Sequence, residues 1–190
     1  MNVKELPADY HLMEDVDLLG NAKYARTITL LALVIAVAGF FLGRLRTPLG
    51  GMFAGRFLGS VVRIGCAVVC MFLYFLLHEW MHGVCIRILG KVKPKYGYAG
   101  IYLYTGTAEV WFDRKSYIII ALAPVVIWGL VLGFVSWVST DEWFWVFHFI
   151  QIINLSGASG DLFITWKILR MPAGVLVQDT GVEMSFYGTT

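Results

Sequence analysis

The chain contains the pentapeptide His78-Glu79-Trp80-Met81-His82, whose residue types are those of a hydrolytic metal site. Residues four apart lie on the same face of a helix, so both imidazoles can reach a single cation. Imidazole nitrogen suits Zn²⁺, and a carboxylate beside the pair can act as a general base toward water at the metal. We therefore predict a zinc ion bound by His78 and His82, one per chain, with Glu79 as the catalytic base. The alternative is a polar cluster that only packs helices together.

A third ligand is needed, because a catalytic zinc site commonly has three protein ligands and one open position. Asp161 is the only acidic residue in the last apolar segment, 143–169. With a rise of about 1.5 Å per residue, His82 lies about 10 Å and His78 about 16 Å from Leu89, the expected cytoplasmic end of its helix. Asp161 lies about 12 Å from Leu169, the corresponding end of the last segment. Because both segments run in the same direction, the three side chains share one layer, and Asp161 is the predicted third ligand.

Asn154 precedes Asp161 by seven residues and is expected on nearly the same helix face. Its amide could donate a hydrogen bond to the scissile carbonyl or to a developing oxyanion. Asparagine in a membrane helix also commonly forms hydrogen bonds to a neighbouring helix. At the level of sequence, both roles are open for this residue.

The composition places these residues in a membrane protein. Apolar residues make up 58% of the chain and charged residues 15%, and the mean hydropathy is +0.71. A water-soluble domain of 190 residues could not bury so much apolar surface. The net charge of +2 is too small to indicate a nucleic-acid partner. The three cysteines lie in one apolar segment, which does not indicate a disulfide framework.

Four segments approach the roughly 20 apolar residues that a helix needs to span a lipid bilayer, namely 25–42, 64–89, 117–137 and 143–169. We therefore predict an all-α, multi-pass protein of the cell membrane that forms a single domain over 1–190. Residues 1–24 form a leader and 170–190 a tail. The leader is acidic, unlike the short basic start of a signal peptide. Four spans place both termini and the 93–114 loop on one side.

The distribution of basic residues predicts the orientation. Of the fifteen lysines and arginines, eleven fall on the side of the two termini and four on the other. Because cytoplasmic loops carry the excess of lysine and arginine, both termini are expected in the cytoplasm.

Between the second and third apolar segments, the 93–114 loop is rich in aromatic and β-branched residues. It predicts a β-hairpin, with strands over 98–104 and 107–112 around a tight turn at Thr105-Gly106. An edge strand of this hairpin could hold an extended substrate peptide. The hairpin could equally be a structural lid.

These features together resemble the site-2 protease group of intramembrane metalloproteases, and most closely a family of small bacterial membrane zincin peptidases. The resemblance covers 73–187 and includes the membrane-embedded HExxH, the following hairpin, Ala-Leu-Ala-Pro at 121–124 and the Asn154-x6-Asp161 pattern. It also includes the tail segment 177–187. The resemblance implies a zinc peptidase with His78, His82 and Asp161 as ligands. One departure is that Leu162 follows Asp161, where larger site-2 proteases have glycine.

The sequence therefore favours a zinc-dependent intramembrane peptidase that cleaves a membrane-embedded or membrane-proximal protein or peptide near the cytoplasmic side. One alternative is a zinc hydrolase that acts on a lipid or a small amphiphile. Another is a metal-binding scaffold without enzymatic activity. Glu79 disfavours the scaffold, because a structural site needs no base beside its ligands.

Overall fold

The computed structural model describes residues 2–18, 20–100, 102–181 and 183–189. The chain divides into two compact units, each made of several segments. The first comprises Met1–Ile28, His78–Pro124 and Gly160–Thr190, and the second comprises Thr29–Leu77 and Val125–Ser159.

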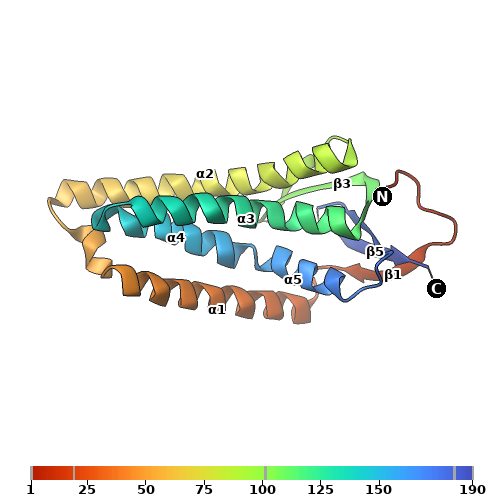
Figure 1. Ribbon diagram of the computed structural model, residues 1–190, viewed down its shortest axis with the longest axis horizontal. Helices are drawn as coiled ribbons and strands as arrows, with labels where there is room; N and C mark the ends of the chain where they lie inside the picture. The colour runs from red at the N-terminus through yellow and green to blue at the C-terminus, as the bar shows by residue number, and fades with distance from the viewer. Residues whose placement is uncertain (1, 19, 101, 182, 190) are drawn as a thin grey trace. The chain divides into compact units, whose positions relative to one another are not determined.

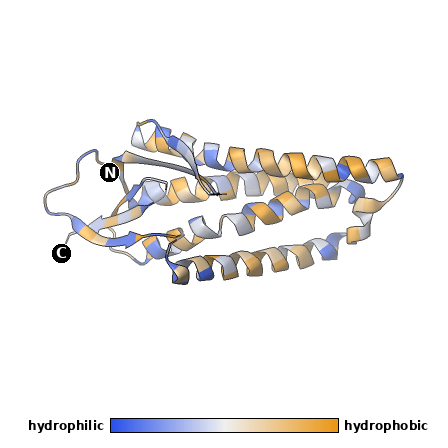
Figure 2. Cartoon of the chain, turned by 180° about the vertical axis from the view of Figure 1, so that it is seen from behind, coloured by the Kyte–Doolittle hydropathy of each residue, from blue (hydrophilic) through white to orange (hydrophobic). Residues whose placement is uncertain are grey.

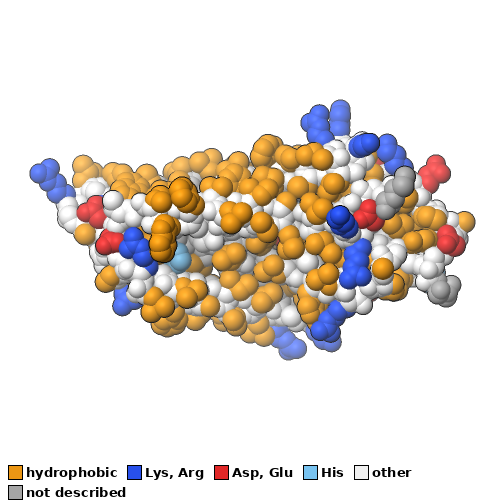
Figure 3. All heavy atoms as spheres, viewed as in Figure 1, with side chains coloured by type: hydrophobic (Ala, Val, Ile, Leu, Met, Phe, Trp, Pro, Cys, Tyr) orange, Lys and Arg blue, Asp and Glu red, His pale blue; other side chains and the backbone are white. Residues whose placement is uncertain are grey.

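Three helices are long and apolar enough to cross a membrane. They are α1 (Ala22–Arg46), α2 (Phe57–Gly90) and α3 (Arg114–Val138). Figure 2 shows hydrophobic residues along these helices, and Figure 3 shows hydrophobic side chains over much of the visible face. Leu33, Phe72 and Leu130 are 58%, 62% and 71% exposed, respectively. Apolar exposure on this scale suits lipid contact rather than water.

The fourth predicted span, 143–169, is not one continuous helix. It consists of α4 (Asp141–Gly157) and α5 (Ser159–Leu169), which a turn at Ala158 separates. The backbone of Ala158 leaves the helical region, with φ −80° and ψ 15°. Glycines 157 and 160 flank this point, and glycine is a poor helix former. Asp161 consequently lies in the first turn of a new helix.

The all-α prediction was wrong, because the chain also contains a five-stranded antiparallel sheet. Its strands are β1 (His11–Val16), β2 (Lys95–Ala99), β3 (Tyr102–Asp113), β4 (Leu176–Asp179) and β5 (Met184–Gly188). The spatial order is β1-β5-β4-β3-β2, so the leader and the tail join the predicted hairpin. All five strands belong to the first unit.

The hydrophobic core of the first unit joins this sheet to the ends of two helices. Phe112 of β3, Val177 of β4 and Phe186 of β5 are at most 1% exposed. They belong to one buried cluster with Ile120 of α3 and Ile164 of α5. Figure 1 shows β3 and β5 beside the first turns of α3. The sheet therefore provides a fixed support for the parts of α3 and α5 that belong to this unit.

The hairpin between α2 and α3 is confirmed, but its predicted turn was wrong. The turn lies between Ala99 and Tyr102, and Thr105-Gly106 is inside a continuous β3, paired with Tyr96 and Lys95. A Cβ at Gly106 would lie 2.2 Å from the backbone nitrogen of Gly181. Glycine occurs here because the tail backbone approaches closely, not because the chain turns.

The second unit has its own core around α4. Trp145 and Val146 are fully buried beside Met52 and Phe144. Arg63 donates hydrogen bonds to the Met52 carbonyl at 2.7 Å and to Glu142 at 3.2 Å. The buried guanidinium thereby ties α2 to the start of α4.

Candidate metal centre

Helix α2 places the two histidines of the HExxH motif side by side, as their spacing predicts. The Nε2 atoms of His78 and His82 are 3.2 Å apart. Both side chains are largely buried, with exposed fractions of 12% and 11%. The ligand atoms of His78, Glu79 and His82 all lie within 4.8 Å of one another, an arrangement that can hold a metal ion.

Asp161 approaches the same two histidines from α5. Its Oδ2 lies 3.4 Å from Nε2 of His78, and its Oδ1 lies 3.7 Å from Nε2 of His82. The structure thus brings together the three side chains that the sequence selected. All three belong to the first unit.

These distances can be compared with the requirements of zinc. In tetrahedral coordination with bonds of about 2.0–2.1 Å, neighbouring donor atoms lie roughly 3.4 Å apart. The observed separations of 3.2, 3.4 and 3.7 Å agree with this value. Two imidazoles and one carboxylate are also a donor set of catalytic zinc sites, which keep a fourth position open. The residues present therefore fit a zinc ion.

A backbone carbonyl fixes the orientation of one imidazole. Nδ1 of His82 lies 2.9 Å from the carbonyl oxygen of Ile120, in α3. A carbonyl can only accept, so Nδ1 carries the proton, and in the neutral imidazole Nε2 keeps its lone pair. That lone pair is on the nitrogen that faces His78 and Asp161. Support of this kind commonly orients metal-binding histidines.

The carboxylate of Glu79 is held by the hairpin. Thr105 of β3 is 8% exposed, and its hydroxyl donates to Oε2 of Glu79 at 2.8 Å. The same hydroxyl lies 3.1 Å from the Glu79 carbonyl oxygen. Sequence reasoning assigned Thr105 to a turn and missed this contact, for which the local sequence contains no signal.

A glycine in α2 allows the hairpin to pack this closely. A Cβ at Gly83, one turn after Glu79, would lie 1.9 Å from the phenolic oxygen of Tyr96 in β2. Burial raises the pKa of Tyr96, and the negative charge of Glu79 adds to the rise while Arg87 opposes it. A larger residue at position 83 would therefore require the Tyr96 side chain to move away from α2.

A second carboxylate, which the sequence analysis did not single out, lies in the tail. Asp179 of β4 accepts hydrogen bonds from the hydroxyl of Tyr117 in α3 and from the backbone N–H of Gly181, the latter at 2.7 Å. Burial raises the pKa of Asp179, and the charge of Asp161 adds to the rise, whereas its hydrogen-bond donors oppose it. Asp179 joins the tail to α3 one turn before Ile120.

Asn154 belongs to the second unit and is fully buried. Its Oδ1 accepts a hydrogen bond from the hydroxyl of Tyr74 at 2.9 Å, and its Nδ2 donates to the Val125 carbonyl at 3.2 Å. These are the interhelical hydrogen bonds that the sequence analysis offered as one alternative. The break at Ala158 also ends the straight helix assumed between Asn154 and Asp161. An oxyanion-binding role for Asn154 stays a prediction.

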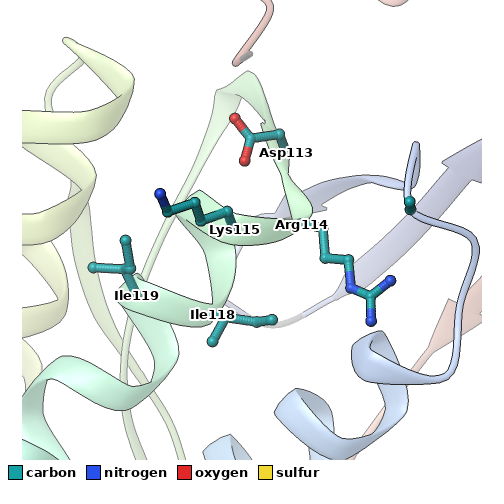
Figure 4. A pocket seen from close by; sticks show the side chains of 6 residues that line it. Asp113, Arg114, Lys115, Ile118 and Ile119 are labelled. Carbon is teal, nitrogen blue, oxygen red and sulfur yellow. The ribbon is translucent and has the colours of Figure 1, made fainter.

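A separate cavity of about 430 Å³ opens at the start of α3, lined by Asp113, Arg114, Lys115, Ile118, Ile119 and Ala173. Figure 4 shows Arg114 directed away from Lys115. The Arg114 guanidinium donates to the carbonyl oxygens of Leu169 and Met171, at 2.7 and 3.2 Å. Because Arg114 provides hydrogen-bond donors to backbone carbonyls at and just beyond the C-terminal end of α5, its charge has a structural role.

Residues 71–176, more than half of the chain, match the model of a family described as "Putative zincin peptidase". An uncharacterized 24.7 kDa protein of Pyrococcus woesei is 30% identical over 122 residues, 62% of this chain and 52% of that protein. The chain thus spans about half the length of this relative. No solved structure matches the chain.

Proposed function

Since the chain belongs to the family described as "Putative zincin peptidase", we propose that it is a zinc-dependent intramembrane peptidase. It hydrolyses a peptide bond of a membrane-embedded or membrane-proximal substrate near the cytoplasmic side. The observation that carries this proposal is the convergence of His78, His82 and Asp161 beside the Glu79 carboxylate. Two nitrogen ligands and one oxygen ligand, with a separate carboxylate base beside them, suit metal-assisted hydrolysis.

The ligands of the zinc ion are His78, His82 and Asp161. Bound there, zinc supplies Lewis acidity, which makes a water molecule more acidic and polarises the scissile carbonyl. Glu79 accepts the proton of the attacking water and passes it to the leaving amine. The Thr105 hydroxyl donates to Oε2 of Glu79 and so favours this orientation of the base. The hydrogen bond from His82 to Ile120 similarly fixes the imidazole.

The hairpin is the proposed binding surface for the substrate. A peptide bond must leave its helix to be cleaved, because helical hydrogen bonds cover the backbone. β2 is at one end of the strand order, so it offers an edge to an extended peptide. The pairing of Tyr96 with Thr105 joins this edge strand to the residue that holds Glu79.

The membrane orientation is also part of the proposal. α1, α2 and α3 cross the bilayer, and α4 with α5 form the fourth crossing as a broken helix. Breaks within a crossing are tolerated where protein covers the freed backbone groups. Both termini are then cytoplasmic, on the side with eleven of the fifteen basic residues. The sheet, which the termini help to form, lies on that side.

The decisive experiment compares Glu79→Gln with the unmodified protein in detergent or lipid nanodiscs. Glutamine removes basicity and keeps the three proposed ligands. We expect a normal zinc content, with cleavage of an unfolding-prone transmembrane peptide reduced by about 10²–10⁴-fold. Glu109→Gln is a matched control, because it makes the same change at an exposed position of β3. Normal cleavage by Glu79→Gln, or hydrolysis of lipid but not peptide, would contradict the proposal.

A further inference from the structure

Helix α3 contains a proline, Pro124, ten residues after it begins at Arg114. Proline has no backbone N–H. In a regular helix the N–H of residue 124 would donate to the carbonyl of residue 120, four positions earlier. The carbonyl of Ile120 therefore lacks its regular helical donor. Helix α3 thus contains, at a position fixed by the sequence, a backbone acceptor that can serve another group.

His82 uses this acceptor. Its Nδ1 lies 2.9 Å from the Ile120 oxygen, and both residues are buried, at 9% and 4% exposure. Pro124 is buried as well. A buried N–H is costly to leave without a partner, so the free carbonyl selects the tautomer protonated at Nδ1. The lone pair then lies on Nε2, which faces His78 and Asp161.

We propose that Pro124 is a positioning residue for His82: by withholding an N–H, it reserves the Ile120 carbonyl for the imidazole. This inference rests on the proposed metal site but not on peptidase activity. A purely structural proline, which only bends α3, makes a different prediction. Its replacement by alanine would leave the His82 tautomer and zinc affinity unchanged.

Two substitutions separate these roles. Pro124→Ala and Pro124→Gly both introduce an N–H that competes for the Ile120 carbonyl, but alanine favours a helix and glycine disfavours it. An effect common to both variants therefore does not come from helix propensity. Ala123→Gly is the matched control, because it loosens the same turn without adding a donor at position 124.

The first measurement is the imidazole ¹⁵N spectrum of metal-free, histidine-labelled protein, in which only four histidines need assignment. We expect His82 to be protonated at Nδ1 in the unmodified protein and in Ala123→Gly, and to become a tautomer mixture in both Pro124 variants. An Nε2-protonated His82 in the unmodified protein would overturn the proposal, even if no variant folds.

The second measurement is the zinc dissociation constant. We expect it to rise by about 10–100-fold in both Pro124 variants, the usual scale for losing support of a ligand, with Ala123→Gly near the unmodified value. Unchanged affinity in Pro124→Ala and Pro124→Gly would overturn the proposal. If the tautomer and the zinc affinities are as expected but the unmodified protein does not cleave peptides, only the proposed peptidase function is contradicted.

Discussion

Replacing Thr105 by valine tests whether β3 orients the Glu79 carboxylate. Valine has nearly the same shape but lacks the hydroxyl that donates to Oε2 at 2.8 Å. A hydrogen bond to a charged group contributes about 1.5–3 kcal/mol. If this bond holds the base in its reactive position, its loss raises the barrier by a similar amount, and kcat falls roughly 10- to 100-fold.

The assay is kcat and KM for a cleavable transmembrane peptide, measured beside zinc content. Zinc content should not change, because the hydroxyl of Thr105 bonds to Glu79, which is not one of the proposed ligands. Thr105→Ser should restore most of the activity, since serine keeps the hydroxyl. If Thr105 only filled space, valine would serve better than serine.

Thr107→Val is the matched control on the same strand. Thr107 is 1% exposed, and its hydroxyl accepts a hydrogen bond from the backbone of Glu109 at 3.3 Å. Its replacement should affect stability but leave kcat nearly unchanged. An unchanged kcat in Thr105→Val, or an equal loss of activity in Thr105→Val and Thr107→Val, would refute this role of Thr105.

Two further predictions concern the metal and the membrane. Asp161→Ala and His82→Ala should each weaken zinc binding by at least about 10-fold in equilibrium dialysis, whereas Cys85→Ala should leave it unchanged. Full zinc affinity in Asp161→Ala would remove Asp161 from the ligand set. In a cysteine-free background, single cysteines are placed near Lys4, near Lys93 and in the tail. These should react with an impermeant reagent only from the cytoplasmic side, and a cysteine near Asp141 should react only from outside. A tail labelled from outside would contradict the fourth crossing.

The hairpin shows where sequence reasoning was wrong and why. The two aromatic, β-branched runs on either side of Thr105-Gly106 predict a tight turn there, and glycine is common in turns. The same residue type also occurs where another backbone comes close, and the tail does so at Gly106. Local sequence cannot separate these two causes, because the second depends on residues far along the chain.

The sequence by itself determined the apolar helices that are long enough to cross a membrane, the HExxH motif and the expectation that Asp161 lies near it. These depend on composition and on helix spacing, which are local properties. Only the tertiary structure decided what supports the site: Thr105 beside Glu79, the Ile120 carbonyl beside His82, and the sheet formed by the leader, hairpin and tail. These contacts join residues distant in the chain, so they follow from packing rather than from periodicity.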